Sequence, residues 1–206
     1  MKQLLFASGI LIVALLGGGC ASTYKPINPP AVYYSAHDLQ DGISFSYKFD
    51  VLRERGNKKY YKKEYKQGLK IVAVKITNNT DTTIYIGQDV AFYSGQNELM
   101  LVDPVVIKKS IRQITPAYLP YLLLSFLRLN VYTESSSDSY PIGLAIGPGL
   151  AAGNMICAGT ANDNLLSELT KYSLINKDIK RGETVYGIIG IRTLEYPALT
   201  LEYRDQ

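Results

Sequence analysis

The chain has almost none of the residues that enzymes most often use for acid–base or metal chemistry at neutral pH. Its 206 residues include one histidine, two cysteines and no tryptophan. It contains no G-x-S-x-G nucleophile motif, no H-E-x-x-H zinc motif and no pair of cysteines at metal-binding spacing. These absences argue against serine hydrolases, zinc proteases and zinc-binding modules. They leave open a hydrolase that uses aspartate or glutamate, because paired acids can lie far apart in a sequence.

The first twenty residues have the composition of a targeting segment. Lys2 provides a positive charge, residues 4–16 are uncharged and mostly apolar, and three glycines precede Cys20. The apolar run is too short to span a bilayer, which takes about 20 residues of helix. This order of charge, apolar core, small residues and cysteine resembles the signal peptide of bacterial lipoproteins.

The resemblance implies that a diacylglycerol is attached to the thiol of Cys20 and that residues 1–19 are removed. Gly17 stands where that family usually has leucine. Ala21 replaces the aspartate that retains such proteins in the inner membrane, so the resemblance implies the outer membrane, with the leaflet open. An ordinary secretory signal with an incidental cysteine, or an uncleaved anchor, is the alternative. Once Cys20 is acylated, only Cys157 remains and no intramolecular disulfide can form.

Residues 20–42 are predicted to be a lipidated tether that precedes a single folded domain. Pro26, Pro29 and Pro30 occur among small and polar residues without a sustained hydrophobic period. If extended at about 3.1 Å per residue, some twenty residues reach roughly 60 Å. His37 lies in this segment, where we expect its side chain to be solvated and to act neither as a metal ligand nor as a catalytic base.

The remaining residues, 43–206, have the pattern of antiparallel strands. Apolar and polar residues alternate over 43–51, and 69–77 is apolar on both faces. Residues 69–101 contain a strand, the turn residues 78–81 and short β-rich runs, and this order resembles the immunoglobulin-like β-sandwich modules of bacterial lipoproteins and extracytoplasmic proteins. The resemblance implies a module that binds or spaces, and it carries over no active-site residue. Further strands are predicted at 82–86, 89–93, 98–102, 183–191 and 199–203.

A largely helical insertion is predicted between the middle and last strands, at about residues 104–179. Asp103 before Pro104 is typical N-cap and first-turn chemistry. The intensely apolar residues 116–127 are predicted to form one helix, and a second is expected from about Pro148. The second helix would pack on the first through a stripe of small residues: Gly149, Gly153, Cys157 and Ala161.

Residues 139–162 carry no charge, so three interpretations of 116–161 stay open: core packing, membrane contact and docking on a partner. Residues 147–152 also match the G-x-G-x-x-A spacing of a dinucleotide loop, but no βαβ unit surrounds them, and no cofactor is predicted. A third, amphipathic helix is predicted at 165–172, capped by the polar residues 162–164.

Positive charge is concentrated in residues 53–70, which hold eight Lys or Arg and two Glu, against a net charge of +4 for the whole chain. Lysines beside tyrosines suit a surface that meets phosphate-bearing headgroups, at about 1 kcal/mol per lysine. The alternative is a solvated hairpin edge that lysines protect from aggregation. An extracytoplasmic location argues against nucleic acid as a partner. The candidate membrane or partner surface comprises Lys58, Lys59, Tyr60, Tyr61, Lys62, Lys63, Tyr65 and Lys66.

Together these features predict a mainly β fold with an α insertion: an immunoglobulin-like antiparallel β-sandwich carrying a helical hairpin between its middle and last strands. The predicted function is that of an outer-membrane-anchored lipoprotein, a non-catalytic binding or assembly module of the cell envelope. Its predicted partners are the membrane, through the lipid on Cys20, and an envelope protein. No catalytic residue, metal or cofactor is predicted. The alternatives are an envelope glycan or peptide hydrolase using Asp or Glu, and a membrane-interacting protein acting through residues 116–161.

Overall fold

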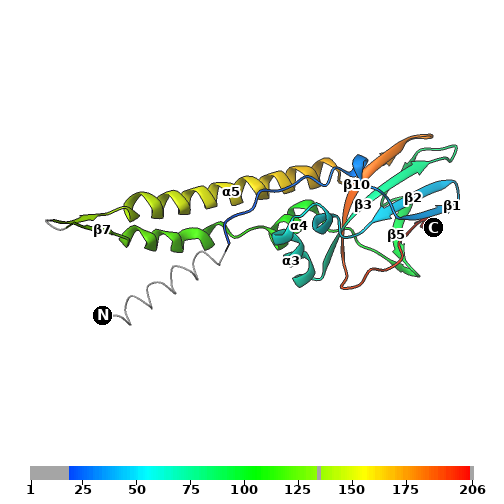
Figure 1. Cartoon of the computed structure of the whole chain (residues 1–206). Helices are drawn as coiled ribbons and strands as arrows, with labels where there is room; N and C mark the ends of the chain where they lie inside the picture. Colours follow the sequence, from blue (N-terminus) through cyan, green and yellow to red (C-terminus); the bar gives the residue numbers. More distant parts are fainter. Residues whose placement is uncertain (1–18, 134–135, 205–206) are drawn as a thin grey trace. The chain divides into compact units, whose positions relative to one another are not determined.

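A computed structural model describes residues 19–133 and 136–204 of the chain (Figure 1). The predicted signal peptide, residues 1–19, lies outside the described residues except for Gly19. The chain divides into two compact units. We call residues 24–112 and 162–204 the sheet unit, and residues 19–23 and 113–161 the hairpin unit.

The sheet unit is built from antiparallel sheets. The first has the strand order β1 (Ala36–Gln40), β2 (Ile43–Lys48), β3 (Leu69–Asn78), β10 (Thr184–Arg192). The second has the order β11 (Thr200–Tyr203), β5 (Val90–Ser94), β6 (Asn97–Glu98), and a separate pair joins β4 (Ile84–Tyr85) to β9 (Asp178–Ile179). In the first sheet, Val74 of β3 lies opposite Tyr47 of β2 and Gly187 of β10.

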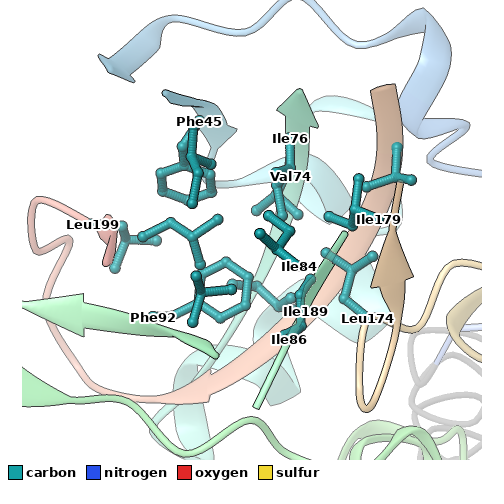
Figure 2. Packing of buried hydrophobic residues seen from close by; sticks show 14 of the residues in the cluster. Phe45, Val74, Ile76, Ile84, Ile86, Phe92, Leu174, Ile179, Ile189 and Leu199 are labelled. Atoms are coloured by element: carbon teal, nitrogen blue, oxygen red, sulfur yellow. The ribbon is translucent and has the colours of Figure 1, made fainter. Parts of the chain in front are cut away.

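The sheets of this unit share one hydrophobic core, shown in Figure 2. Phe45, Val74 and Ile189 enter it from the first sheet, and Phe92 enters it from β5. The rings of Phe45 and Phe92 lie 5.6 Å apart in an edge-to-face arrangement. The prediction of antiparallel β-structure combined with helices is thereby confirmed. Other members of the core are Ile43, Val72, Ile76, Ile84, Ile86, Val90, Leu174, Ile179, Val185, Ile191, Leu199 and Leu201.

The strands with the clearest hydrophobic pattern lie where the sequence predicts them. β3 is buried on both faces over most of its length, as its apolar residues on both sides require. Strand β2 is shorter than the predicted 43–51, because Asp50 adopts a left-handed backbone conformation (φ 59°) and the chain turns into helix α2 (Val51–Glu54). Helix α3 (Lys58–Lys66) follows, so residues 53–66 do not form the hairpin edge that was the alternative for this segment.

The predicted tether is wrong for residues 24–42, which are part of the sheet unit. Tyr24, Ile27 and Tyr34 are buried, and a 3₁₀ turn η1 (Pro29–Ala31) leads towards β1. Strand β1 pairs with β2 from Ala36 opposite Tyr47 to Gln40 opposite Ile43. The physical reason is that burying the apolar side chains of this segment lowers the free energy more than solvating an extended chain does.

The insertion contains the expected helices in a different arrangement. Helix α4 (Pro104–Ile111) begins as predicted, with a carboxylate oxygen of Asp103 accepting from the Val105 amide at 2.7 Å. The predicted helix at 116–127 is a 3₁₀-helix, η2 (Thr115–Phe126), which suits a segment interrupted by Pro120. An unpredicted ribbon of β7 (Leu129–Tyr132) and β8 (Ser137–Tyr140) follows.

The two helices predicted from Pro148 and at 165–172 are one continuous helix, α5 (Gly143–Lys171). Both predictions are wrong about their starting points. Pro148 lies near the beginning of α5, and Gly143 and Gly147, which precede it, pack closely against η2. Residues 143–161 of this helix belong to the hairpin unit, and the rest belong to the sheet unit.

Candidate functional site

The hairpin unit is held together by one face of each of its two helical segments. Tyr118, Tyr121 and Leu124 recur every third residue, so the 3₁₀ period places them on one side of η2, where all three are buried. They pack with Ala151 and Ala158 of α5. The rings of Tyr118 and Tyr121 are nearly parallel, with centroids 6.5 Å apart. This contact is narrow and involves only a few residues.

Glycines allow the close approach of α5 to η2. A Cβ on Gly143 would lie 2.2 Å from the backbone oxygen of Leu124, and a Cβ on Gly147 would lie 2.5 Å from Oγ of Ser125. The packing stripe therefore runs through Gly143, Gly147 and Ala151. The stripe predicted from Gly149 and Gly153 is wrong, because a Cβ on either would have nothing within 4 Å.

The outward faces of the hairpin unit are apolar. Residues 113–127 and 139–161 contain no charged residue; of the described residues between them, Arg128 directly precedes β7 and Asp138 lies on β8. Phe126 is 83% exposed, Ile156 69% and Leu144 65%. Monomeric soluble proteins rarely expose large continuous apolar areas, which indicates that a surface of this kind is unstable in water. Further exposed apolar side chains of this unit are Ile114, Leu119, Leu122, Leu123, Leu129, Val131, Ile142 and Ile146.

The segment that follows Cys20 is bound to this hairpin by two buried amide side chains. The Ala21 amide donates to Oδ1 of Asn154 at 2.5 Å, and the Ser22 amide donates to Oε1 of Gln113 at 3.1 Å. Nε2 of Gln113 donates in return to the Ser22 carbonyl at 2.6 Å. Asn154 and Gln113 are thus buried polar residues in an otherwise apolar unit, and the N-terminal backbone is among the partners of both. Cys20 itself is exposed.

The predicted lysine and tyrosine surface lies on helix α3. Lys58, Lys62 and Lys66 follow one another at i, i+4 spacing and are exposed; Tyr65 is exposed as well. Lys59, Tyr61 and Lys63 are partly buried, and Nζ of Lys63 donates to the Arg112 carbonyl. The described structure therefore keeps most of this group at or near the surface of the sheet unit.

Tyr60 does not belong to that surface. It is fully buried, its hydroxyl donates to Oδ1 of Asn162 at 3.1 Å, and its ring meets that of Tyr24 edge to face at 5.7 Å. The sequence assignment of Tyr60 to an exposed surface is wrong. In a helix, residues 60 and 64 share a face opposite to the one that carries the lysines, and that face packs inward.

Two buried ionisable residues, Glu64 of α3 and Lys70 of β3, were not anticipated from the sequence. Glu64 is 1% exposed; its Oε1 accepts from the Ile71 amide at 2.7 Å, and its Oε2 has no hydrogen-bond partner among the described residues. Burial raises the pKa of Glu64 to about 7, against the lowering effects of the Ile71 hydrogen bond and of Lys70. Lys70, also buried, places Nζ 3.7 Å from the ring centroid of Tyr196. The sequence signal that could have indicated the burial of Glu64 is its i, i+4 spacing from Tyr60, which places the two residues on one face of a helix.

Glu64→Gln is expected to remove most of the pH dependence of stability between pH 4.5 and 7. The folded state keeps the Glu64 proton up to about pH 7, whereas the carboxyl ordinarily ionises near 4.5. Because the folded state binds more protons in this window, the wild-type free energy of unfolding falls as pH rises, by roughly 2 to 3 kcal/mol. Glutamine cannot ionise and still accepts from Ile71, so this fall should disappear.

Urea unfolding at pH 5 and pH 8 measures the effect of Glu64→Gln. The matched control is Glu195→Gln, since Glu195 is exposed in the sheet unit. The control should follow the wild-type pH dependence. A wild type whose stability is equal at the two pH values, or a Glu64→Gln variant that still loses stability at pH 8, contradicts the assignment.

Other candidate chemistry finds no support in the described residues. Residues 147–152 are part of helix α5, so they cannot form the loop that a dinucleotide requires. Within residues 19–133 and 136–204, no group of three or more His, Cys, Asp and Glu side chains could hold a metal ion. His37 lies on β1 with Nδ1 2.8 Å from Oγ of Ser46.

Comparison with known proteins adds no relative. No family model, no curated protein and no solved structure matches the chain. Its function must therefore be inferred from its residues and their arrangement.

Proposed function

We propose that the chain is an outer-membrane lipoprotein, anchored through a lipid on Cys20, that acts as a non-catalytic binding or assembly module of the bacterial cell envelope. The observation that carries the proposal is the position of the segment after Cys20. Ala21 and Ser22 are hydrogen-bonded to a hairpin whose outward faces are apolar and uncharged. A lipid on Cys20 would therefore start next to the part of the chain that most needs an apolar environment.

The sheet unit is the proposed binding part, as an immunoglobulin-like β-sandwich. Two features support this assignment: the antiparallel sheets β1-β2-β3-β10 and β11-β5-β6 contribute side chains to one core, and short turns join β1 to β2, β3 to β4 and β5 to β6. Strand β1 is at the edge of the first sheet, with Leu39 72% exposed. An edge strand offers backbone groups to a partner strand, so an envelope protein that adds a strand is the proposed type of partner.

Membrane contact through the hairpin unit is the second proposed function. It is favoured by the concentration of exposed Leu, Ile and Phe side chains in residues 113–161 and by the absence of charge from both helical segments. The exposed lysines of α3 provide a further surface that would be attracted to anionic headgroups. Two or more membrane signals bind more stably than a single lipid chain does.

Cys20→Ala is expected to abolish lipidation completely. Wild-type protein should start at Cys20 and carry a diacylglyceryl group on the thiol, and intact-mass and peptide-mass measurements on protein from the native envelope detect both. Cys157→Ala is the matched control, because it removes the other cysteine of the chain and should leave the acyl mass unchanged. A wild-type protein without acyl mass contradicts the anchor. Mass is the deciding measurement because the apolar hairpin could hold the protein in the membrane fraction without the lipid.

A further inference from the structure

We infer that the hairpin unit crosses the bilayer, so that the β7–β8 ribbon is exposed on the side opposite to the sheet unit. The inference deepens the proposed membrane contact and rests on the proposed anchor at Cys20. Its basis is the distribution of charge along the hairpin, the length of its helical segments and the position of Ala21 on α5.

Charge is distributed along the hairpin as in a membrane-crossing element. On one side, Arg112 and Asp163 are the charged residues nearest to the uncharged segments. On the other side, the charges of the described residues are Arg128 and Asp138. Everything between these two levels is uncharged on both segments, as a membrane-crossing segment requires, because a charge at the centre of a bilayer is costly. The hairpin is therefore uncharged over one continuous length and carries charges at both of its limits.

The uncharged length matches the thickness of a membrane. From Gly143 to Ala161, α5 is about 28 Å long at 1.5 Å per residue, and the 12 residues of η2 cover about 24 Å at 2.0 Å per residue. The apolar band of an outer membrane is about 25 Å tall, and a typical hydrocarbon core is about 30 Å thick. Both segments are helical, so each satisfies most of its backbone hydrogen bonds internally, as crossing requires.

The burial of α5 distinguishes it from a core helix of the same composition. Of the 18 consecutive residues of α5 that are most apolar by mean hydropathy, only 28% are buried. The exposed side chains occur on several sides of the hairpin, including Phe126 of η2 and Leu144 and Ile156 of α5. A protein partner would cover one face and leave the others in water, whereas a bilayer surrounds the hairpin completely. A helix that is hydrophobic all round is typical of a buried or membrane environment.

The ribbon at the end of the hairpin has the composition of an interfacial and aqueous segment. Its strands have four residues each, too few for the roughly 9 to 11 that a strand needs to cross a membrane. Tyr132 and Tyr140 are exposed there, as expected for aromatic residues at a headgroup region. Thr133 and Ser136 hydrogen-bond to each other in the connecting loop, which is rich in serine.

The position of Cys20 along the hairpin is consistent with a hairpin that crosses the membrane. Ala21 is bonded to Asn154, which lies about 17 Å along α5 from Gly143. An apolar band of about 25 Å that begins at Gly143 would end about 8 Å beyond Asn154. The glycerol group on Cys20 would thus start within about 8 Å of the boundary on the sheet-unit side, and its acyl chains would extend alongside the hairpin towards the ribbon.

Cysteine labelling of the full-length lipidated protein in intact cells tests the crossing. In a Cys157→Ser background, three variants are compared: Asn79→Cys in the sheet unit, Ala152→Cys in the middle of α5, and Ser136→Cys in the ribbon loop; all three positions are exposed. The probe is a membrane-impermeant maleimide, added before and after permeabilisation of the outer membrane.

We expect the thiols introduced at positions 79 and 136 to react on opposite sides: one before permeabilisation and the other only after it, by a factor of at least about ten. Position 152 should react only after detergent is added. Labelling of 79 and 136 on the same side overturns the crossing. If position 152 is then still protected, protein covers the hairpin, for example in a second copy of this chain. The acyl mass on Cys20 is measured in the same samples, so that loss of the anchor and loss of the crossing are seen separately.

Discussion

Phe92→Ala is expected to lower the free energy of unfolding of the sheet unit by about 3 to 5 kcal/mol. Phe92 is 1% exposed and packs edge to face on Phe45, in the core that both sheets share. Removing the ring leaves a cavity, because the surrounding strands are hydrogen-bonded and cannot collapse into it. With a total stability of roughly 5 to 15 kcal/mol for ordinary domains, a loss of this size is a large fraction of what holds the unit together.

Phe126→Ala is the matched control, since it removes the same side chain from a position that is 83% exposed in the hairpin unit. It should change stability in detergent by no more than about 0.5 kcal/mol. Urea unfolding of the full-length protein, followed by circular dichroism of the β-sheet signal, measures both variants. Equal losses from Phe92→Ala and Phe126→Ala would show that the shared core is not where the stability of the sheet unit lies.

Gly147→Leu is expected to separate η2 from α5 in the hairpin unit. A Cβ at this position would lie 2.5 Å from Oγ of Ser125, 2.7 Å from its backbone nitrogen and 3.2 Å from the Tyr121 carbonyl. Backbone atoms cannot move aside unless the whole of η2 moves. Overpacking of this kind costs about 1 to 3 kcal/mol or more, so amide hydrogen exchange in residues 115–127 should become roughly tenfold faster or more.

Gly149→Leu provides the comparison for Gly147→Leu. It lies in the same helix and makes the same change of residue, but a Cβ there has nothing within 4 Å. Its exchange in residues 115–127 should stay close to that of wild type, as measured by mass spectrometry on the full-length protein in detergent micelles. If both variants accelerate exchange equally, helix propensity and not close packing controls the hairpin.

Elements with a strong local pattern could be predicted from the sequence. Strands β3 and β10 were found because their β-branched residues are apolar in runs of strand length, and α4 was found because Asp103 and Pro104 are favourable at a helix start. Local chemistry was sufficient in these cases, since the signals act within one or two turns of backbone. It was not sufficient for residues 24–42, whose prolines suggested a tether although β1 pairs with β2.

The candidate site shows the same division between local and long-range information. The uncharged runs around 116–127 and 139–162 are visible in the sequence, as is the arrangement of glycines before Cys20. The face that α5 presents to η2 was wrongly predicted, because a helix rich in small residues offers several stripes with the same spacing. Only the contact of Gly143 and Gly147 with η2 decides between them.

The sequence by itself determined where the charge lies, where the strongest strands and helix starts are, and that Cys20 has the surroundings of a lipidation site. These properties depend on residue type and on short spacings. Only the tertiary structure decided that Ala21 is bonded to Asn154, that Tyr60 and Glu64 are buried, and that the outer faces of the hairpin stay apolar and exposed. Such properties depend on contacts between residues that are far apart in the chain, because these contacts determine which side chains are buried.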